Sequence, residues 1–333
     1  MKSMLTGRMR SKNKTLSSRK PFLLFVASLL CTAMMLPSIA SAAYYNTYTT
    51  VAPIDNVGDI TSAQGFDVGS VYAYSIKVNK NDTKAVIYRT NMSTGATTLM
   101  KNGDGTNYTT QLGHANDIVL STIDGTHYMF VVTTKVGSMS LVKLKYVGDT
   151  YTKVGNYTIK LNGQDKLMTG VKITSKDTNN IHFLFKTGMK PEPGQIYFRG
   201  TLPLNANSGI IHVTEAFRLN IAGAKVNGNT IANIDLYANQ GFGYHNNSIY
   251  VPLTFENISI VLVYRHISTA SGTINADDNL SFRITSEAFP LFEIESVGIA
   301  HGNKLWFNTN RRTDPNTGHD GVHYFNGFSA SQM

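Results

Sequence analysis

The chain of 333 residues contains a single cysteine, Cys31, so no intrachain disulfide can stabilise it. No stretch after residue 42 sustains the 3.6-residue apolar period of an amphipathic helix. That region also has no apolar run long enough to cross a bilayer, and we expect no transmembrane segment there. These absences leave a fold that depends on its own hydrophobic core, for which about 290 residues are ample.

The first 42 residues differ from the rest in composition. They hold seven basic residues and no acid, followed by an apolar run over 21–40 and by the small residues Ala40-Ser41-Ala42. This order is typical of a secretory signal peptide, and we predict cleavage after Ala42. A retained membrane anchor is the alternative, which Pro37 and the small residues disfavour. The expected location is secreted, either extracellular or associated with the cell surface.

The net charge of +9 arises mostly in this segment. Removing it leaves 23 basic against 21 acidic residues, a charge of about +2. A nearly neutral protein lacks the electrostatic attraction that nucleic-acid binding requires, so we expect no such partner. Cys31 is also removed, and export without cysteine is more typical of a bacterium than of a eukaryotic secretory route.

Short runs rich in Val, Ile, Tyr, Phe and Thr follow, each closed by Gly, Asn or Asp. This pattern predicts β-strands over 71–78, 85–89, 129–133, 141–147, 181–185, 196–199 and 258–264. Turn dipeptides lie between them at Asp104-Gly105, Asp124-Gly125, Asn162-Gly163 and Asn227-Gly228. The proline-rich piece 190–194 is interpreted as a hairpin loop, and the fold class is all-β.

An internal repeat refines this prediction. Gln64-Gly65-Phe66 and Gln240-Gly241-Phe242 each precede a polar turn and a β run, and similar strand starts occur near residues 113, 169 and 295. Units of 49 to 71 residues with short strands indicate a β-propeller, most simply with five blades in one domain over 43–333. A β-sandwich or β-helix explains the recurrent starts less well.

The last unit, from Glu293 to Phe328, has room for only three strands, whereas the segment 46–57 has no local partner. We therefore predict that the N-terminal strand, near 47–51, pairs with the C-terminal blade. Such closure removes exposed sheet edges.

The strand starts also resemble those of the helveticin J family, large bacteriocins secreted by lactic acid bacteria. The likeness lies in the stretches Val68 to Tyr74, His114-Ala115, Gln240-Gly241-Phe242 with Asn247 to Tyr250, and Glu293 to Val297. It implies an antimicrobial protein that acts at the surface of related bacteria in a defense response to bacterium. It implies no catalytic residues.

Polar and aromatic residues at the strand starts form the predicted binding face of the propeller: Gln64, Phe66, His114, Asn116, Asp117, Gln240, Phe242, Glu293, Glu295 and His301. Amides and carboxylates hydrogen-bond hydroxyls, and aromatic faces cover sugar C–H surfaces. The expected partner is a bacterial envelope glycan, a teichoic-acid-like polymer or a surface receptor. The alternative for each residue is a structural role, satisfying buried backbone groups.

Three functions remain open: a bacteriocin-like protein that binds the envelope, a non-lethal lectin-like surface protein, and a propeller glycosidase. A glycosidase needs acids that converge on one pocket, and the acids near strand starts are Asp67, Asp117, Asp235, Glu293 and Glu295. No His pair has metal-ligand spacing, so neither a metal nor another cofactor is expected. The residues do not decide whether the protein is an enzyme, although binding is favoured.

Overall fold

The computed structural model describes residues 42–332 except 189–194 and 315–316. The predicted signal peptide, up to residue 41, and the proline-rich loop 190–194 lie outside the described residues. Ala42–Met333 form one compact unit.

The described residues form β-strands and three short 3-10 turns, η1 (Gly137–Met139), η2 (Ile234–Leu236) and η3 (Ala330–Gln332), which confirms the all-β prediction. The predicted strand 141–147 coincides with β10 (Leu141–Val147). The other predicted strands overlap observed ones, with ends that coincide or are displaced by at most four residues. Alternating β-branched and aromatic residues therefore located the strands correctly.

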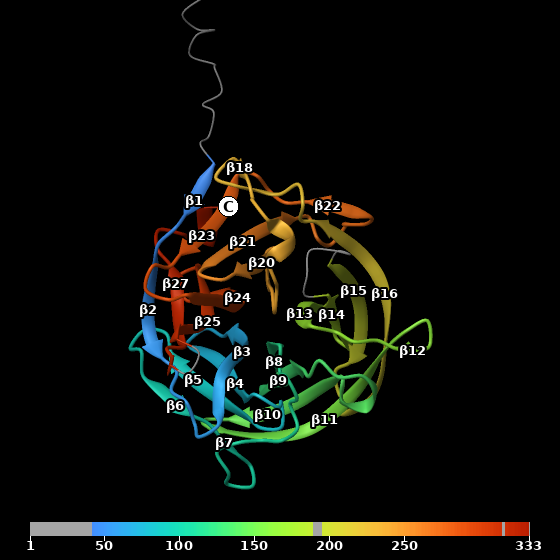
Figure 1. Ribbon diagram of the computed structural model, residues 1–333. Helices are drawn as coiled ribbons and strands as arrows, with labels where there is room; N and C mark the ends of the chain where they lie inside the picture. Colours follow the sequence, from blue (N-terminus) through green and yellow to red (C-terminus); the bar gives the residue numbers. More distant parts are fainter. Residues whose placement is uncertain (1–41, 189–194, 315–316, 333) are drawn as a thin grey trace, which may run out of the picture. The chain divides into compact units, whose positions relative to one another are not determined.

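Three antiparallel sheets occupy one side of the ring in Figure 1. The first holds β3 (Ile60–Val68), β4 (Tyr72–Asn79), β5 (Ala85–Asn91) and β6 (Thr97–Leu99). The second holds β19 (Gly243–His245), β20 (Ser248–Phe255), β21 (Ile258–Arg265) and β23 (Leu280–Thr285), with β1 (Ala43–Tyr45) added in parallel. The third holds β24 (Leu291–Ala300), β25 (Lys304–Asp314), β26 (Thr317–Gly318), β27 (Gly321–Phe325) and β2 (Tyr48–Pro53).

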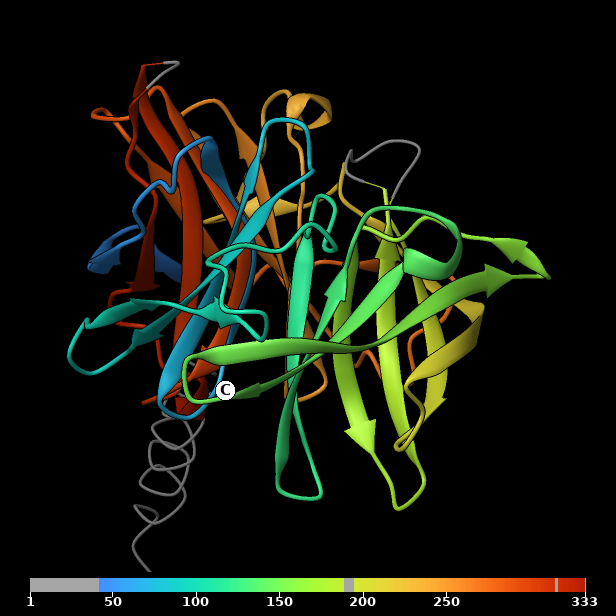
Figure 2. The same ribbon diagram turned by 90° about the horizontal axis from the view of Figure 1, so that it is seen from below.

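The remaining large sheet has 11 strands and curls into a nearly closed barrel (Figure 2). One half contains β8 (Asp117–Ile123), β9 (Thr126–Val132), β10, β11 (Thr150–Leu161), β7 (Lys101–Asn102) and β12 (Gln164–Asp165). The other contains β13 (Gly170–Lys176), β14 (Asn180–Thr187), β15 (Ile196–Pro203), β16 (Ser208–Asn220) and β22 (Thr273–Asn275). A separate hairpin consists of β17 (Lys225–Val226) and β18 (Asn229–Thr230), with the predicted turn dipeptide Asn227-Gly228 between them.

This joined sheet differs from the separate blades that the repeat predicts. β11 and β16 are the longest strands of their units, and they pair in parallel from Asn156↔Ser208 to Leu161↔Val213. Large apolar side chains fill the interior, including Phe130, Phe183, Phe185 and Phe198. The strands are long enough for the outer edges of two units to meet, so each covers the open edge of the other.

The predicted closure by the N-terminal strand is confirmed. β2 pairs antiparallel with β27, from Tyr48↔Phe325 to Pro53↔Gly321, as the outer strand of the C-terminal sheet (Figure 1). The observed strand begins one residue later and ends two residues later than the predicted 47–51. β1 adds a contact that was not predicted, because it extends the neighbouring sheet through β23.

The innermost strands approach one another closely at the two Gln-Gly-aromatic repeats. A Cβ at Gly65 would lie 2.7 Å from Ala115 O, and a Cβ at Gly241 would lie 2.5 Å from Ser296 Oγ. The glycine amides form hydrogen bonds at these close approaches: Gly65 N donates to Ala115 O, and Gly241 N donates to Glu295 O. The repeat therefore marks positions where neighbouring inner strands are joined.

Substituting Gly241 with alanine is expected to lower the free energy of unfolding by about 1–3 kcal/mol, because the new methyl overpacks a rigid contact. Gly69→Ala is the control, since a Cβ there would meet its nearest atom, Tyr72 O, at an ordinary 3.5 Å. Urea denaturation measures both variants. Equal stability of the two would contradict the assignment of Gly241 to a close strand contact.

Candidate functional site

The polar residues brought together at one end of the inner strands are Gln64, Gln240, Glu293, Glu295 and Asn310, which we call the polar cluster. Glu293 and Glu295 lie on β24, where a bulge between Ile294 and Ser296 displaces Glu295 from the regular register. Gln64 lies at a bulge of β3. Bulges re-aim side chains, which is how residues on neighbouring inner strands reach the same end of the ring.

Glu293 is held by two long hydrogen bonds. Gln240 Nε2 donates to Glu293 Oε1 and Asn310 Nδ2 donates to Glu293 Oε2, both at 3.4 Å. Bonds of this length are weak, since N–H···O distances centre near 2.9–3.0 Å. The half-buried Glu293 side chain therefore retains capacity to bind other donors.

Several acceptor oxygens of the cluster are buried without a partner. Within the described residues, no hydrogen bond reaches Gln64 Oε1, Gln240 Oε1 or either carboxyl oxygen of Glu295. Glu295 has no exposed surface and Gln64 is 4% exposed. A buried acceptor without a donor costs about 1–3 kcal/mol, and either ordered water or a ligand can supply donors to these atoms.

Burial raises the pKa of Glu295 well above its usual range, and the nearby charge of Glu293 raises it further. Burial also raises the pKa of Glu293, whereas its contacts with Gln240, Glu295 and Asn310 and the charge of His114 oppose that shift. His114 itself is half-buried, with Nδ1 at 3.0 Å from Asp82 Oδ1. The two glutamates thus form a pair in which Glu295 keeps its proton more readily.

Lys186 binds the backbone carbonyl of Gln240. Its fully buried Nζ donates to Gln240 O at 2.5 Å, to Gly188 O at 3.2 Å and to Asn239 Oδ1. Burial lowers the pKa of Lys186 to about 7. Sequence reasoning did not select this residue, because nothing in the run 181–187 separates it from other strand lysines.

Asp117 was expected on the binding face, but it is fully buried in the ring. Its Oδ1 lies 2.8 Å from Lys172 Nζ and accepts from Ser296 Oγ at 2.9 Å, while Oδ2 accepts from Val171 N at 3.1 Å. Burial raises the pKa of Asp117, and the charge of Lys172 acts in the opposite direction. Asp117 joins β8, β13 and β24, so its role is structural.

Four other predicted residues lie away from the polar cluster. Asn116 is buried and its Nδ2 donates to Thr169 O at 2.5 Å. Phe66 and Phe242 have no exposed surface and pack in the core, Phe242 edge-on to Tyr197 at 5.2 Å between ring centroids. Neither phenylalanine offers a face to a ligand. His301 is exposed in the turn after β24, where Nε2 lies 3.1 Å from Ser93 Oγ.

The acids considered for a glycosidase do not all converge. Asp67 accepts a hydrogen bond from Leu120 N at 2.8 Å, and burial raises its pKa. Asp235 is exposed in η2. Of the five acids, only Glu293 and Glu295 share the polar cluster.

Sequence reasoning also missed Asn310. It pairs with Glu293 across the β24–β25 hairpin. Counting outward from the turn at Gly302-Asn303 finds this pair only when the extra residue of the bulge at Glu295 is included, and no local pattern marks that bulge.

Within the part of the chain that the structure describes, no three His, Cys, Asp or Glu side chains are grouped closely enough to hold a metal ion. No helix among those residues has the length and apolar character that a membrane span requires.

No known protein-family model matches the chain, and no curated protein matches its sequence. Among solved structures, the catalytic domain of Coprinopsis cinerea GH62 alpha-L-arabinofuranosidase aligns with 8% identity and a TM-score of 0.46 over 86% of this chain and 98% of that one. A GH43 enzyme from Xanthomonas citri complexed with xylose aligns with 10% identity and a TM-score of 0.46 over 92% and 95%.

The PQQ-bound aldose sugar dehydrogenase from Streptomyces coelicolor aligns with 13% identity and a TM-score of 0.40 over 83% of this chain and 96% of that one. Likenesses at these scores assign neither a family nor an activity to this chain.

Proposed function

We propose that the protein is an exported carbohydrate-binding protein whose polar cluster binds a hydroxyl-rich polymer of the bacterial envelope. The observation that carries the proposal is the set of four buried acceptor oxygens without partners on Gln64, Gln240 and Glu295. Sugar hydroxyls both donate and accept, so they can donate to the Gln64 and Gln240 oxygens and pair with a Glu295 carboxyl that keeps its proton. Glu293 and Asn310 add an acceptor and a donor at the rim of the same cluster.

The architecture proposed with this function is a five-bladed propeller in which two blades have fused through β11 and β16. Each half of the 11-stranded sheet contributes one four-stranded unit, β8 to β11 and β13 to β16, and the three other sheets contribute one unit each. The inner strands of these five units begin near the repeat positions that the sequence shows. Three of these starts, at Gln64, Gln240 and Glu293, contribute residues to the polar cluster.

Replacing Glu295 with methionine is expected to weaken binding to purified Gram-positive cell walls by about tenfold or more, since a hydrogen bond to a carboxyl is worth about 1.5–3 kcal/mol. The same change should stabilise the fold by about 1–2 kcal/mol at pH 7, because it removes a buried acid without a partner. Cell-wall pull-down and urea denaturation measure the two effects.

The pH dependence has a defined sign. The pKa of Glu295 is raised in the folded state, so its cost to stability grows as the pH rises above about 4.5. The stabilisation by Glu295→Met should therefore be largest at neutral pH and disappear below pH 4.5. Glu287→Met, the same change at an exposed acid, is the control.

Unchanged wall binding by Glu295→Met, with and without a chelator, would refute the proposal.

A glycan-cleaving enzyme is the second candidate. The observation in its favour is the pair Glu293 and Glu295, because a carboxyl with a raised pKa suits a general acid. Reducing-sugar release from cell-wall or plant polysaccharides that disappears in Glu293→Gln would support it. Asp117 is unsuited to this role, since it is buried and paired with Lys172.

Killing of the bound cells is a separate proposal, which follows from the resemblance to secreted bacteriocins. Growth of a panel of related Gram-positive strains with the purified protein tests it. Wall binding without growth inhibition would instead support the non-lethal lectin-like protein.

A further inference from the structure

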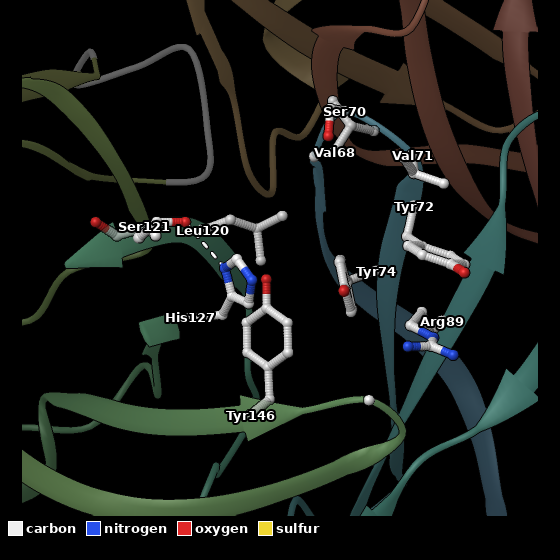
Figure 3. A pocket seen from close by; sticks show the side chains of 13 residues that line it. Val68, Ser70, Val71, Tyr72, Tyr74, Arg89, Leu120, Ser121, His127 and Tyr146 are labelled. Carbon is white, nitrogen blue, oxygen red and sulfur yellow. Dashed lines mark hydrogen bonds between the residues drawn. The ribbon is translucent and has the colours of Figure 1, made fainter. Parts of the chain in front are cut away.

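A cavity of about 510 Å³ lies between β3, β4 and β5 on one side and β8, β9 and β10 on the other. Figure 3 shows Tyr72, Tyr74, Arg89, Ser121, His127 and Tyr146 around it. Along β3 the cavity residues Val68 and Gly69 follow Gln64 of the polar cluster, and on β8 the cavity is lined by residues after Asp117. The cavity and the polar cluster thus use opposite ends of the inner strands. The volume of the cavity is within the range of small-molecule sites, about 300–1,000 Å³.

Aromatic rings form its walls and support one another. The ring centroids of Tyr74 and Tyr146 are 5.2 Å apart. The rings of His127 and Tyr146 are stacked, with their centroids 5.5 Å apart. His127 Nδ1 is fixed at 2.9 Å from Thr122 Oγ1. Rings held in this way offer rigid apolar faces with polar groups at their edges, and both C–H surfaces and hydroxyls can contact them.

Polar groups in the lining are present and not fully used. Ser121 Oγ is buried and has no hydrogen-bond partner among the described residues, although Ser121 borders the cavity. Burial raises the pKa of Tyr74 and of Tyr146, so both hydroxyls stay neutral at physiological pH and can donate as well as accept.

The lining is close to electrically neutral. Arg89 is its only Lys, Arg, Asp or Glu side chain among the described residues, and Arg89 Nη2 lies 2.5 Å from Asp149 Oδ1. The guanidinium also lies over the ring of Tyr72, 4.3 Å from its centroid. Arg89 is therefore partly neutralised by Asp149, and its Nε, which has no hydrogen-bond partner among the described residues, can donate to a sugar hydroxyl.

We propose that this cavity is a second carbohydrate site, which binds a short neutral saccharide against Tyr72 and the hydroxyl edges of Tyr74 and Tyr146. The inference does not depend on the proposed function of the polar cluster. If both sites are occupied, one protein molecule binds two glycan segments at once. Because the two sites are linked in one molecule, avidity rises without any new contact.

The test is saturation-transfer NMR and calorimetry on the whole protein with neutral saccharides built from glucose, galactose, N-acetylglucosamine or xylose, and with glucuronate and glucose 6-phosphate as anionic probes. Val71 borders the cavity and is 45% exposed, so Val71→Trp should block the cavity without unfolding the protein. We expect it to abolish binding at the cavity, whether or not the polar cluster also binds sugar. Tyr146→Phe keeps the ring and should weaken binding about three- to tenfold.

Val136→Trp, the same change at an exposed position outside both the cavity and the polar cluster, should leave this binding unchanged. The inference fails if no neutral saccharide binds at millimolar concentration, if an anionic probe is preferred, or if Val71→Trp binds normally. Loss of binding in Glu295→Met but not in Val71→Trp would assign all sugar binding to the polar cluster and would also refute the second site.

Discussion

Replacing Asp117 with alanine is expected to lower the free energy of unfolding by about 3–5 kcal/mol, because removing one partner of a buried ion pair leaves the other uncompensated. Lys172 Nζ, which lies 2.8 Å from Asp117, would keep only the carbonyls of Ile118 at 2.6 Å and Phe66 at 3.3 Å. The change would also leave Val171 N without its acceptor, and Ser296 Oγ would keep the longer bond to Phe242 O at 3.4 Å. A loss of this size is a large part of the typical 5–15 kcal/mol of a folded domain.

Two comparisons isolate this effect, with urea denaturation as the measurement. Asp278→Ala, at an exposed position, should change stability by less than about 0.5 kcal/mol. The double variant Asp117→Asn with Lys172→Met removes both charges and should be more stable than Asp117→Ala. An Asp117→Ala variant as stable as Asp278→Ala would show that the carboxyl does not join the inner strands.

A chain that begins at Gly58 is expected to lose most of its stability, because it lacks β1 and β2. Tyr45 stacks on Phe282 at 5.2 Å and Tyr48 packs against Phe292 at 5.3 Å, while Ile54 is buried. Each such side chain contributes about 1.5–3 kcal/mol of burial. The deletion also exposes the β27 edge, so the loss is about 5 kcal/mol or more and the product should aggregate.

Thermal melting and size-exclusion chromatography compare this chain with one that begins at Ala42. A synthetic peptide of residues 43–57 should restore part of the lost melting temperature, since the missing strands pair through backbone hydrogen bonds. An unchanged melting temperature without the peptide would contradict the role of β2 in closing the ring.

Much of the fold could be predicted because its signals are local. Alternation in the run 141–147 located β10 to the residue, and the missing fourth strand of the last unit indicated that β2 pairs with β27. The candidate site was predicted only in part. Gln64, Gln240, Glu293 and Glu295 do gather at one end of the inner strands, whereas Phe66, Phe242 and Asp117 are buried by contacts between strands far apart in the sequence.

The sequence by itself determined the all-β class, the recurring strand starts and the glycines that let inner strands approach. A period of two and a residue without Cβ are properties of a few neighbouring positions. Only the tertiary structure decided that β11 and β16 join two units into one sheet. It also decided that Asp117 is paired while Glu295 is not, and that Tyr74 and Tyr146 face one cavity. These outcomes depend on which surfaces meet across the ring, and that information is absent from any local pattern of residues.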